Sequence, residues 1–163
     1  MSKKASVGTP ATVALTKAGV AFEVHTYDHD PSAASFGLEA ADALGVPVEQ
    51  VFKTLLADVD GSLVVGVVPV TGQLDLKALA SAAGGKKATM ADPKAAERTT
   101  GYVVGGISPI GQKKPLRTVV DATALSFDAV YVSAGKRGAD ISLAPGDLVA
   151  ITKATTADIR AGA

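Results

Sequence analysis

The lysine within QVFKTLLADV is the most informative single residue of this sequence, because a lysine on an apolar strand face is unusual. An alternating strand here places Lys53 on the apolar face that carries Val51 and Leu55. Partial burial lowers the pKa of an ammonium, whereas a nearby carboxylate raises it. Residue pattern alone leaves two interpretations open: a lysine held in a pocket, or an edge-strand lysine whose ammonium reaches water.

The segment TGYVVGGISPIGQKK is rich in glycine and contains a second candidate site. Its glycines either let main-chain N–H groups approach a ligand closely or simply form a bulge and a turn. In the first interpretation the N–H groups of Gly105, Gly106 and Ile107 point at a carbonyl oxygen, as in an oxyanion hole. Ser108 and Gln112 would add side-chain donors. The pattern therefore indicates either a loop whose N–H groups bind a ligand or a plain turn.

The segment HTYDHD brings together metal-ligating residue types at His25, Asp28, His29 and Asp30. The four-residue spacing of the histidines suits a helix, whereas this segment leaves a strand for a turn. No HExxH or similar ligand pattern accompanies it. We therefore expect polar residues at a strand end rather than a metal site, with Tyr27 available to a pocket.

The segment VSAGKRGADISL predicts a turn between two strands that carries Ser133, Lys136, Arg137 and Asp140. By strand alternation, Asp140 and Ser142 share a face. The segment is either a hairpin with charged residues at its tip or part of a site. A Ser-His-Asp triad is not favoured, because the chain contains no GxSxG motif.

Composition limits the classes of function. The chain has 163 residues and no cysteine, so a disulfide, a thiolate metal site and a cysteine nucleophile of the protein's own are excluded. No signal-like or membrane-length apolar run is present, which predicts a cytoplasmic protein. With 16 basic and 16 acidic residues, any nucleic acid must be bound by local patches. The candidate patches are Lys86–Lys87, Lys113–Lys114 with Arg117, and Lys136–Arg137.

Hydrophobic periodicity and capping residues predict an α+β protein with a mixed or partly closed sheet. We expect a single domain over residues 1–163 with its core at about 9–152, followed by a tail that forms a short helix or frays. The expected helices are 9–18, 36–44, 75–83 and 92–98. The expected strands are 22–27, 51–59, 62–70, 102–105, 117–122, 129–134, 140–144 and 147–152, with a hairpin turn at Asp60–Gly61.

Several motifs in a fixed order resemble one known family. From Thr9 to Thr152 the chain carries HTYDHD, SFG, QVFKTLLA, VVPVTGQLDLKALA, MADP, ERTTGYVVGGISPIGQKK, VVDA and YVSAGKRGADISLAPGDL. In these motifs the sequence resembles the YbaK/EbsC family of free-standing aminoacyl-tRNA editing proteins. The resemblance implies a curved mixed sheet flanked by helices, and a pocket for the 3′ aminoacyl-adenosine of charged tRNA.

The resemblance also implies an activity, the removal of cysteine from tRNA(Pro) and less selectively from tRNA(Cys). In the implied reaction the thiol of the bound cysteine attacks its own ester, and neither a cofactor nor a metal takes part. Charged tRNA would be the partner, with prolyl-tRNA synthetase in a transient complex. An alanyl-tRNA(Pro) hydrolase and a noncatalytic module that binds tRNA or a synthetase are the alternatives. Departures at Ala134, Ala139 and Ser142 leave the exact amino-acid preference open.

The family motifs carry over to specific residues. Lys53, Gly105 and Gly106 take the catalytic positions. The implied substrate-binding residues are Tyr27, Phe36, Ser133 and Asp140, and the glycine-rich segment adds Ile107 and Ser108 as candidates. The candidate tRNA contacts are Lys113, Lys114, Lys136 and Arg137.

Overall fold

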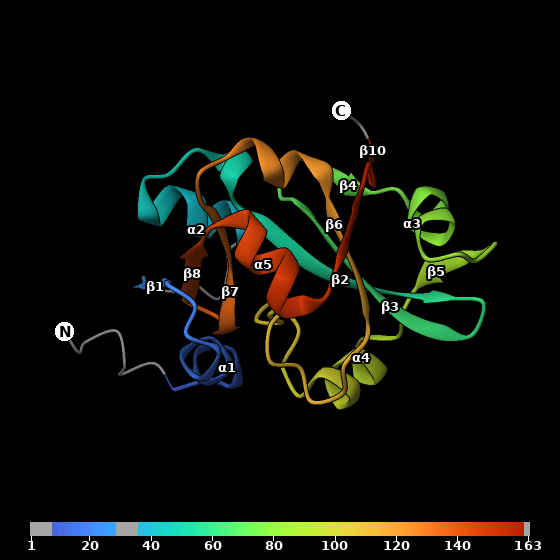
Figure 1. The fold of residues 1–163 in the computed structure, drawn as a ribbon, viewed down its shortest axis with the longest axis horizontal. Helices are drawn as coiled ribbons and strands as arrows, with labels where there is room; N and C mark the ends of the chain where they lie inside the picture. The colour runs from blue at the N-terminus through green and yellow to red at the C-terminus, as the bar shows by residue number, and fades with distance from the viewer. Residues whose placement is uncertain (1–7, 29–35, 162–163) are drawn as a thin grey trace.

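The computed structural model describes residues 8–28 and 36–161, and of Phe36 and Gly37 the backbone alone. Helices and strands alternate irregularly along the chain (Figure 1). The helices are α1 (Pro10–Ala18), α2 (Phe36–Leu44), α3 (Leu76–Ala82), α4 (Pro93–Thr100) and α5 (Pro145–Thr152), with 3-10 turns η2 (Val48–Gln50) and η3 (Ala122–Ser126). The strands are β1 (Glu23–Thr26), β2 (Phe52–Val59), β3 (Ser62–Pro69), β4 (Gln73–Leu74), β5 (Ala88–Met90), β6 (Arg117–Asp121), β7 (Val130–Lys136), β8 (Ala139–Leu143), β9 (Thr155–Ala157) and β10 (Arg160–Ala161).

Within the described residues the strands form three sheets. The largest has the order β5-β2-β3-β6-β9, in which β2 is antiparallel to β3 and β5, and β6 is parallel to β3 and β9. An antiparallel sheet has the order β1-β8-β7, and β4 pairs with β10. A parallel bridge between Val51 and Tyr131 joins the two larger sheets at the start of β2. The predicted α+β class with a mixed sheet is confirmed, although the strands divide among separate sheets.

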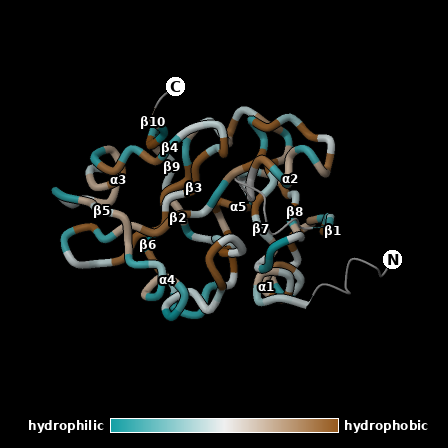
Figure 2. Tube along the Cα trace, turned by 180° about the vertical axis from the view of Figure 1, so that it is seen from behind, coloured by the Kyte–Doolittle hydropathy of each residue, from teal (hydrophilic) through white to brown (hydrophobic). Residues whose placement is uncertain are grey.

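Two hydrophobic clusters stabilise this arrangement. One lies between the two larger sheets and includes Phe52, Leu56, Val132 and Ile141. The other packs Leu79 of α3 and its neighbours against the five-stranded sheet. Figure 2 shows hydrophobic residues running along the central strands β2, β3 and β6. Lys53 therefore belongs to a strand with core packing on both faces.

Local signals explain most of the elements. Thr9 forms a capping box with Thr12, and Pro10 opens α1 at its first turn. Asp60 and Gly61 both have positive φ, 50° and 92°, as a two-residue turn between β2 and β3 requires. The helix expected at 36–44 and the hairpin at Asp60–Gly61 are confirmed. No helix of the described residues is long and apolar enough to cross a membrane.

Two expected strands are wrong. Residues 147–152 lie in helix α5, where Pro145 occupies the first turn and Leu148 is fully buried against the core. A proline start and tertiary packing outweigh the β-branched residues of that segment. Residues 102–105 form no strand, and Val104 and Gly105 lie in a turn that is closed by the Gly106 N–H donating to the Val103 carbonyl oxygen at 2.9 Å.

The C-terminal segment also differs from the expected helix or frayed tail. Strand β9 extends the five-stranded sheet beside β6, and β10 pairs with β4. Ile159 between them is fully buried, and its N–H donates to the buried Asp121 carboxylate at 2.9 Å. Packing therefore continues beyond residue 152.

Candidate active site

A pocket of about 390 Å³ lies at the junction of the two larger sheets. Its walls come from residues 51–56 around the start of β2, from α4, from the loop 104–107 and from the β7–β8 hairpin. Such a volume suits one small ligand or the end of a larger one. The pocket brings together seven of the predicted site residues: Lys53, Gly105, Ile107, Tyr27, Ser133, Asp140 and Lys136.

Lys53 lies half-buried in the pocket wall. It stands opposite Val68 in the β2–β3 ladder, so its backbone position is fixed by two paired strands. Burial lowers the pKa of its ammonium below the usual value. Among the described residues no carboxylate pairs with this ammonium. A cation held in this way is available to a negatively charged or polarised ligand.

The main chain of Val104 is hydrogen-bonded to two side chains, one from α4 and one from the β7–β8 turn. The Val104 N–H donates to the Glu97 carboxylate of α4 at 2.8 Å. The Val104 carbonyl oxygen accepts from the Arg137 guanidinium, whose Nε lies at 3.0 Å. Arg137 therefore connects the β7–β8 turn to the loop, and its contact with tRNA stays a prediction.

Two adjacent glycines shape this loop for different reasons. Gly105 has φ +90°, a backbone conformation that side-chain-bearing residues rarely adopt. Gly106 has no room for a side chain, because a Cβ there would lie 2.9 Å from the backbone of Lys136 and Arg137. The loop thus sits directly on the β7–β8 turn.

The structure corrects which N–H groups could hold a ligand. The Gly106 N–H is engaged by the Val103 carbonyl oxygen at 2.9 Å, and Gly106 does not line the pocket. Gly105 and Ile107 do line it. Their N–H groups have no acceptor within the described part of the chain. These two groups, rather than the Gly105–Gly106 pair, are the donors available to a carbonyl oxygen.

Ser108 does not reach the pocket either. It is fully buried, and its hydroxyl oxygen accepts the Ile110 N–H at 3.2 Å. The Gln112 side-chain amide donates to the Ser108 carbonyl oxygen at 3.0 Å. Both predicted donors therefore hold the loop together instead of facing a substrate.

Polar residues of β7, β8 and the end of β1 line the same pocket as Lys53. Ser133 and Asp140 are direct cross-strand partners, and Tyr27 follows β1 with its N–H bonded to the Gly138 carbonyl oxygen at 3.0 Å. Burial, aided by Asp140 and Glu39, raises the pKa of Tyr27 to about 12. Burial raises the pKa of the Asp140 carboxyl to about 7. The phenol is thus a neutral donor, while Asp140 changes charge near neutral pH.

The raised pKa of Asp140 predicts how stability depends on pH. Because the folded protein binds this proton more tightly than the unfolded chain, the contribution is complete below about pH 4 and is lost as pH rises through 7. Between these values the free energy of unfolding should fall by roughly 2–4 kcal/mol relative to that of Asp140→Asn. Urea unfolding of both proteins across this range checks it, and parallel pH profiles would contradict it.

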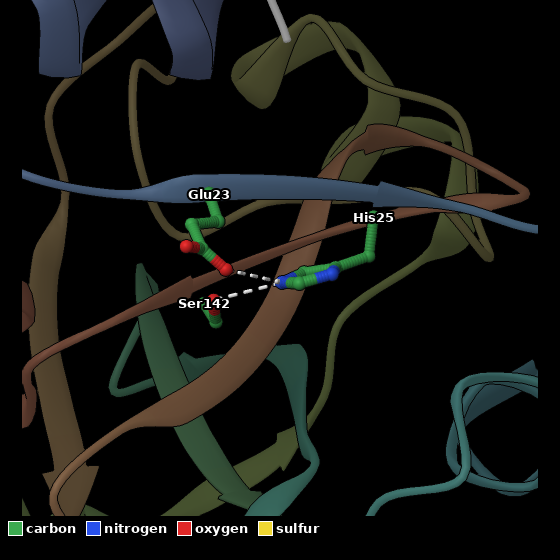
Figure 3. Close-up of polar contacts among 3 residues, drawn as sticks. All are labelled: Glu23, His25 and Ser142. Carbon is green, nitrogen blue, oxygen red and sulfur yellow. Dashed lines mark hydrogen bonds and ion pairs between the residues drawn. The ribbon is translucent and has the colours of Figure 1, made fainter.

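His25 and Ser142 form a contact that resembles part of a hydrolase triad but lacks its geometry. His25 Nε2 lies 2.8 Å from Ser142 Oγ and 3.8 Å from Glu23 Oε1 (Figure 3). A working triad places the hydroxyl and the carboxylate on different ring nitrogens. Here both approach the same nitrogen, and neither His25 nor Ser142 lines the pocket. The cluster therefore offers no activated nucleophile.

The remaining predicted residues differ in whether they line the pocket. Lys136 lines the pocket, whereas Lys113 and Lys114 are exposed outside it, in a segment bound to α4 through main-chain hydrogen bonds to Thr99 and Thr100. Phe36 begins α2, but its side chain lies outside the described part. His29 and Asp30 of the considered metal site also lie outside the described residues.

The sequence reasoning missed Thr54, Met90 and Val104, which also line the pocket. Met90 and Val104 are exposed hydrophobic residues at its walls, 51% and 38% accessible. Strand alternation places Thr54 on the face opposite Lys53, so the position of the lysine does not predict that Thr54 shares its pocket. Its position beside a polar residue in an apolar strand was the available signal.

The family model and two relatives that match this chain are described as proteins of aminoacyl-tRNA editing or deacylation. The family model described as "Aminoacyl-tRNA editing domain" matches residues 30–151. The chain is 44% identical over 120 residues to the "Putative Cys-tRNA(Pro)/Cys-tRNA(Cys) deacylase EbsC" of Enterococcus faecalis, covering 73% of each protein. It is 28% identical over 151 residues to the "Multifunctional Ser/Thr-tRNA deacylase ProXp-y" of Escherichia coli K12, covering 90% of this chain and 88% of the relative.

A solved structure described as a "putative trans-editing enzyme for prolyl tRNA synthetase" aligns with 99% of both chains, at 28% identity and a TM-score of 0.83. The family model spans most of the chain and includes Lys53, the glycine loop and the β7–β8 hairpin. The resemblance predicted from the ordered motifs is thereby confirmed. The chain belongs to the aminoacyl-tRNA editing domain family.

Proposed function

We propose that this chain is a trans-editing deacylase that removes cysteine from mischarged tRNA(Pro), and less selectively from tRNA(Cys). One observation supports this most: the half-buried Lys53 ammonium, without a carboxylate partner among the described residues, shares a pocket with the uncommitted N–H groups of Gly105 and Ile107. That set matches an ester whose carbonyl gains negative charge. The name of the E. faecalis relative supports cysteine as the amino acid.

The need for such an enzyme follows from the limits of binding selectivity. A synthetase pocket shaped for proline distinguishes side chains that differ by one methylene by only about 1–3 kcal/mol. Cysteine and alanine therefore enter it, and a second site must remove them from the tRNA. A free-standing domain with a pocket for the aminoacyl end can supply that second site.

In the proposed reaction the substrate supplies its own nucleophile. The thiol sulfur of the cysteinyl group attacks its ester carbonyl carbon, a C–S bond forms, and the C–O bond to the terminal ribose breaks. The thiol proton passes to the departing ribose oxygen, so free tRNA and a cyclic thioester leave. The chain contains no cysteine, and no histidine is found among the described residues of the pocket wall to activate Ser133. Both facts support attack by the substrate.

Each pocket residue takes a defined part in this proposal. Lys53 orients the aminoacyl ester or the terminal phosphate, and the N–H groups of Gly105 and Ile107 hold the carbonyl oxygen as it gains charge. Tyr27, as a neutral phenol, and the facing Ser133–Asp140 pair position the amino group and the ribose.

The test is a comparison of tRNA(Pro) charged with cysteine, alanine or serine under identical conditions. We expect the cysteinyl ester to be released at least about tenfold faster, because a thiol is a better nucleophile than a hydroxyl and alanine has none. Fastest release of alanine would instead support the alanyl-tRNA hydrolase alternative. Equal release of cysteine and serine would reject substrate-thiol attack. The serine arm matters because the E. coli relative is named a Ser/Thr-tRNA deacylase.

The proposal places charged tRNA as the partner, in the cytoplasm, with prolyl-tRNA synthetase in a transient complex. Formal net charge is zero, so tRNA binding depends on local groups such as Lys136 at the pocket and exposed Lys113 and Lys114. We expect modest affinity that falls as salt rises, since few phosphates are neutralised.

A further inference from the structure

Strand β2 leaves part of one edge without a strand partner. The Leu56 carbonyl oxygen accepts the Ala91 N–H at 3.0 Å on the side away from β3. Main-chain groups two residues apart face the same side of a strand, so those of Thr54 also face away from β3. On that side β5 pairs only with Ala57–Val59, and the bridge to β7 lies at Val51. Thr54 therefore lies in the gap between them, where the pocket is.

The Thr54 hydroxyl is also unsatisfied. Its Oγ1 is buried and has no hydrogen-bond partner. Among the described residues that are not exposed, no other buried side-chain oxygen or nitrogen lacks a partner. On the same face of β2 it is flanked by Phe52 and Leu56, both buried in the core. A buried hydroxyl without a partner is costly and calls for an explanation.

We propose that Thr54 reads the side chain of the bound aminoacyl group, by hydrogen-bonding a thiol or hydroxyl that an alanyl group lacks. This inference rests on the function proposed above and names the residue that gives it selectivity. No hydrogen bond engages the Thr54 hydroxyl, and the residue already lines the pocket, so this hydroxyl is the unsatisfied polar group available to a ligand there.

The chemistry separates the competing substrates. A cysteinyl thiol or a seryl hydroxyl both donates and accepts, and so satisfies the Thr54 hydroxyl. An alanyl methyl group offers that hydroxyl no hydrogen-bond partner. Thr54 is thus a specificity residue that orients the sulfur for attack, while Lys53 and the N–H groups of Gly105 and Ile107 act on the ester.

The experiment compares wild type, Thr54→Val and Thr54→Ser on cysteinyl- and alanyl-tRNA(Pro). Valine keeps the shape of threonine without the hydroxyl, and serine keeps the hydroxyl. We expect Thr54→Val to lower the ratio of cysteinyl to alanyl deacylation about threefold to tenfold, the size of one hydrogen bond between neutral groups. Thr54→Ser should restore most of that ratio. Thr118→Val is the control, because Thr118 is a buried threonine of β6 outside the pocket.

Thermal unfolding supplies a second measurement. The Tm of Thr54→Val should equal or exceed that of wild type, since an unsatisfied hydroxyl is removed, whereas Thr118→Val loses a bond to the Leu116 carbonyl oxygen and should melt lower. A Tm for Thr54→Val as low as that of Thr118→Val would overturn the inference. An unchanged ratio of cysteinyl to alanyl deacylation in Thr54→Val would overturn this inference and leave the proposed function intact. Absence of turnover by the wild-type protein would overturn both.

Discussion

Replacing Lys53 by alanine is expected to lower the rate of cysteinyl-tRNA(Pro) deacylation by about 100- to 1000-fold, the usual effect of losing one group that stabilises a developing charge. Lys53 lines the pocket, and its backbone is fixed in the paired β2–β3 ladder. Water that enters after the substitution cannot supply a positive charge at that place. Single-turnover release of labelled cysteine measures the effect.

Folding should survive this change, because burial already disfavours the charged form of Lys53. Lys53→Met, which keeps an unbranched chain without the charge, should therefore unfold with a free energy equal to or slightly above that of wild type. Lys77→Ala is the matched control, since Lys77 is an exposed lysine on α3, outside the pocket. A Lys53→Ala protein with nearly wild-type turnover would reject the assigned role.

The second large effect is expected for Gly106→Ala. A Cβ at this position lies 2.9 Å from backbone atoms of Lys136 and Arg137, so the loop or the β7–β8 turn must move. Movement displaces the N–H groups of Gly105 and Ile107 from the carbonyl oxygen. We expect about a 100-fold loss of single-turnover deacylation and a decrease of about 1–3 kcal/mol in the free energy of unfolding.

Gly146 provides the control for this substitution. It lies in helix α5, where a Cβ added to it would meet no neighbouring atom within 4 Å. Gly146→Ala should therefore keep full activity and gain up to about 1 kcal/mol of stability. Equal activity of the two alanine variants would show that close contact between loop and hairpin is not required.

Much of the fold could be predicted because local signals decide it. Thr9 with Pro10, the Asp60–Gly61 turn and the Asp92 cap each satisfy their own backbone groups. Helix α5 was not predicted, since its β-branched residues favour a strand, whereas Pro145 in the first turn and the burial of Leu148 together favour the helix. The pairing of β9 and β10 depends on partners more than 30 residues earlier in the chain.

The site residues likewise divide into those that local sequence predicts and those that depend on tertiary contacts. Lys53 could be found because a lysine interrupts an apolar strand, and Asp140 because it follows a glycine turn. The roles of Gly106 and Arg137 could not, because they depend on contact between the loop at Val104 and the β7–β8 turn. Thr54 was missed because alternation separates it from Lys53, while the open edge of β2 exposes both to one pocket.

Release of labelled cysteine from cysteinyl-tRNA(Pro), with the protein far below the concentration of charged tRNA, tests the central proposal most directly. It also distinguishes an enzyme from a module that only binds tRNA or a synthetase. We predict many turnovers per protein molecule, with wild type exceeding Lys53→Ala by about 100-fold or more. Tight binding of charged tRNA with release no faster than in buffer would contradict the account.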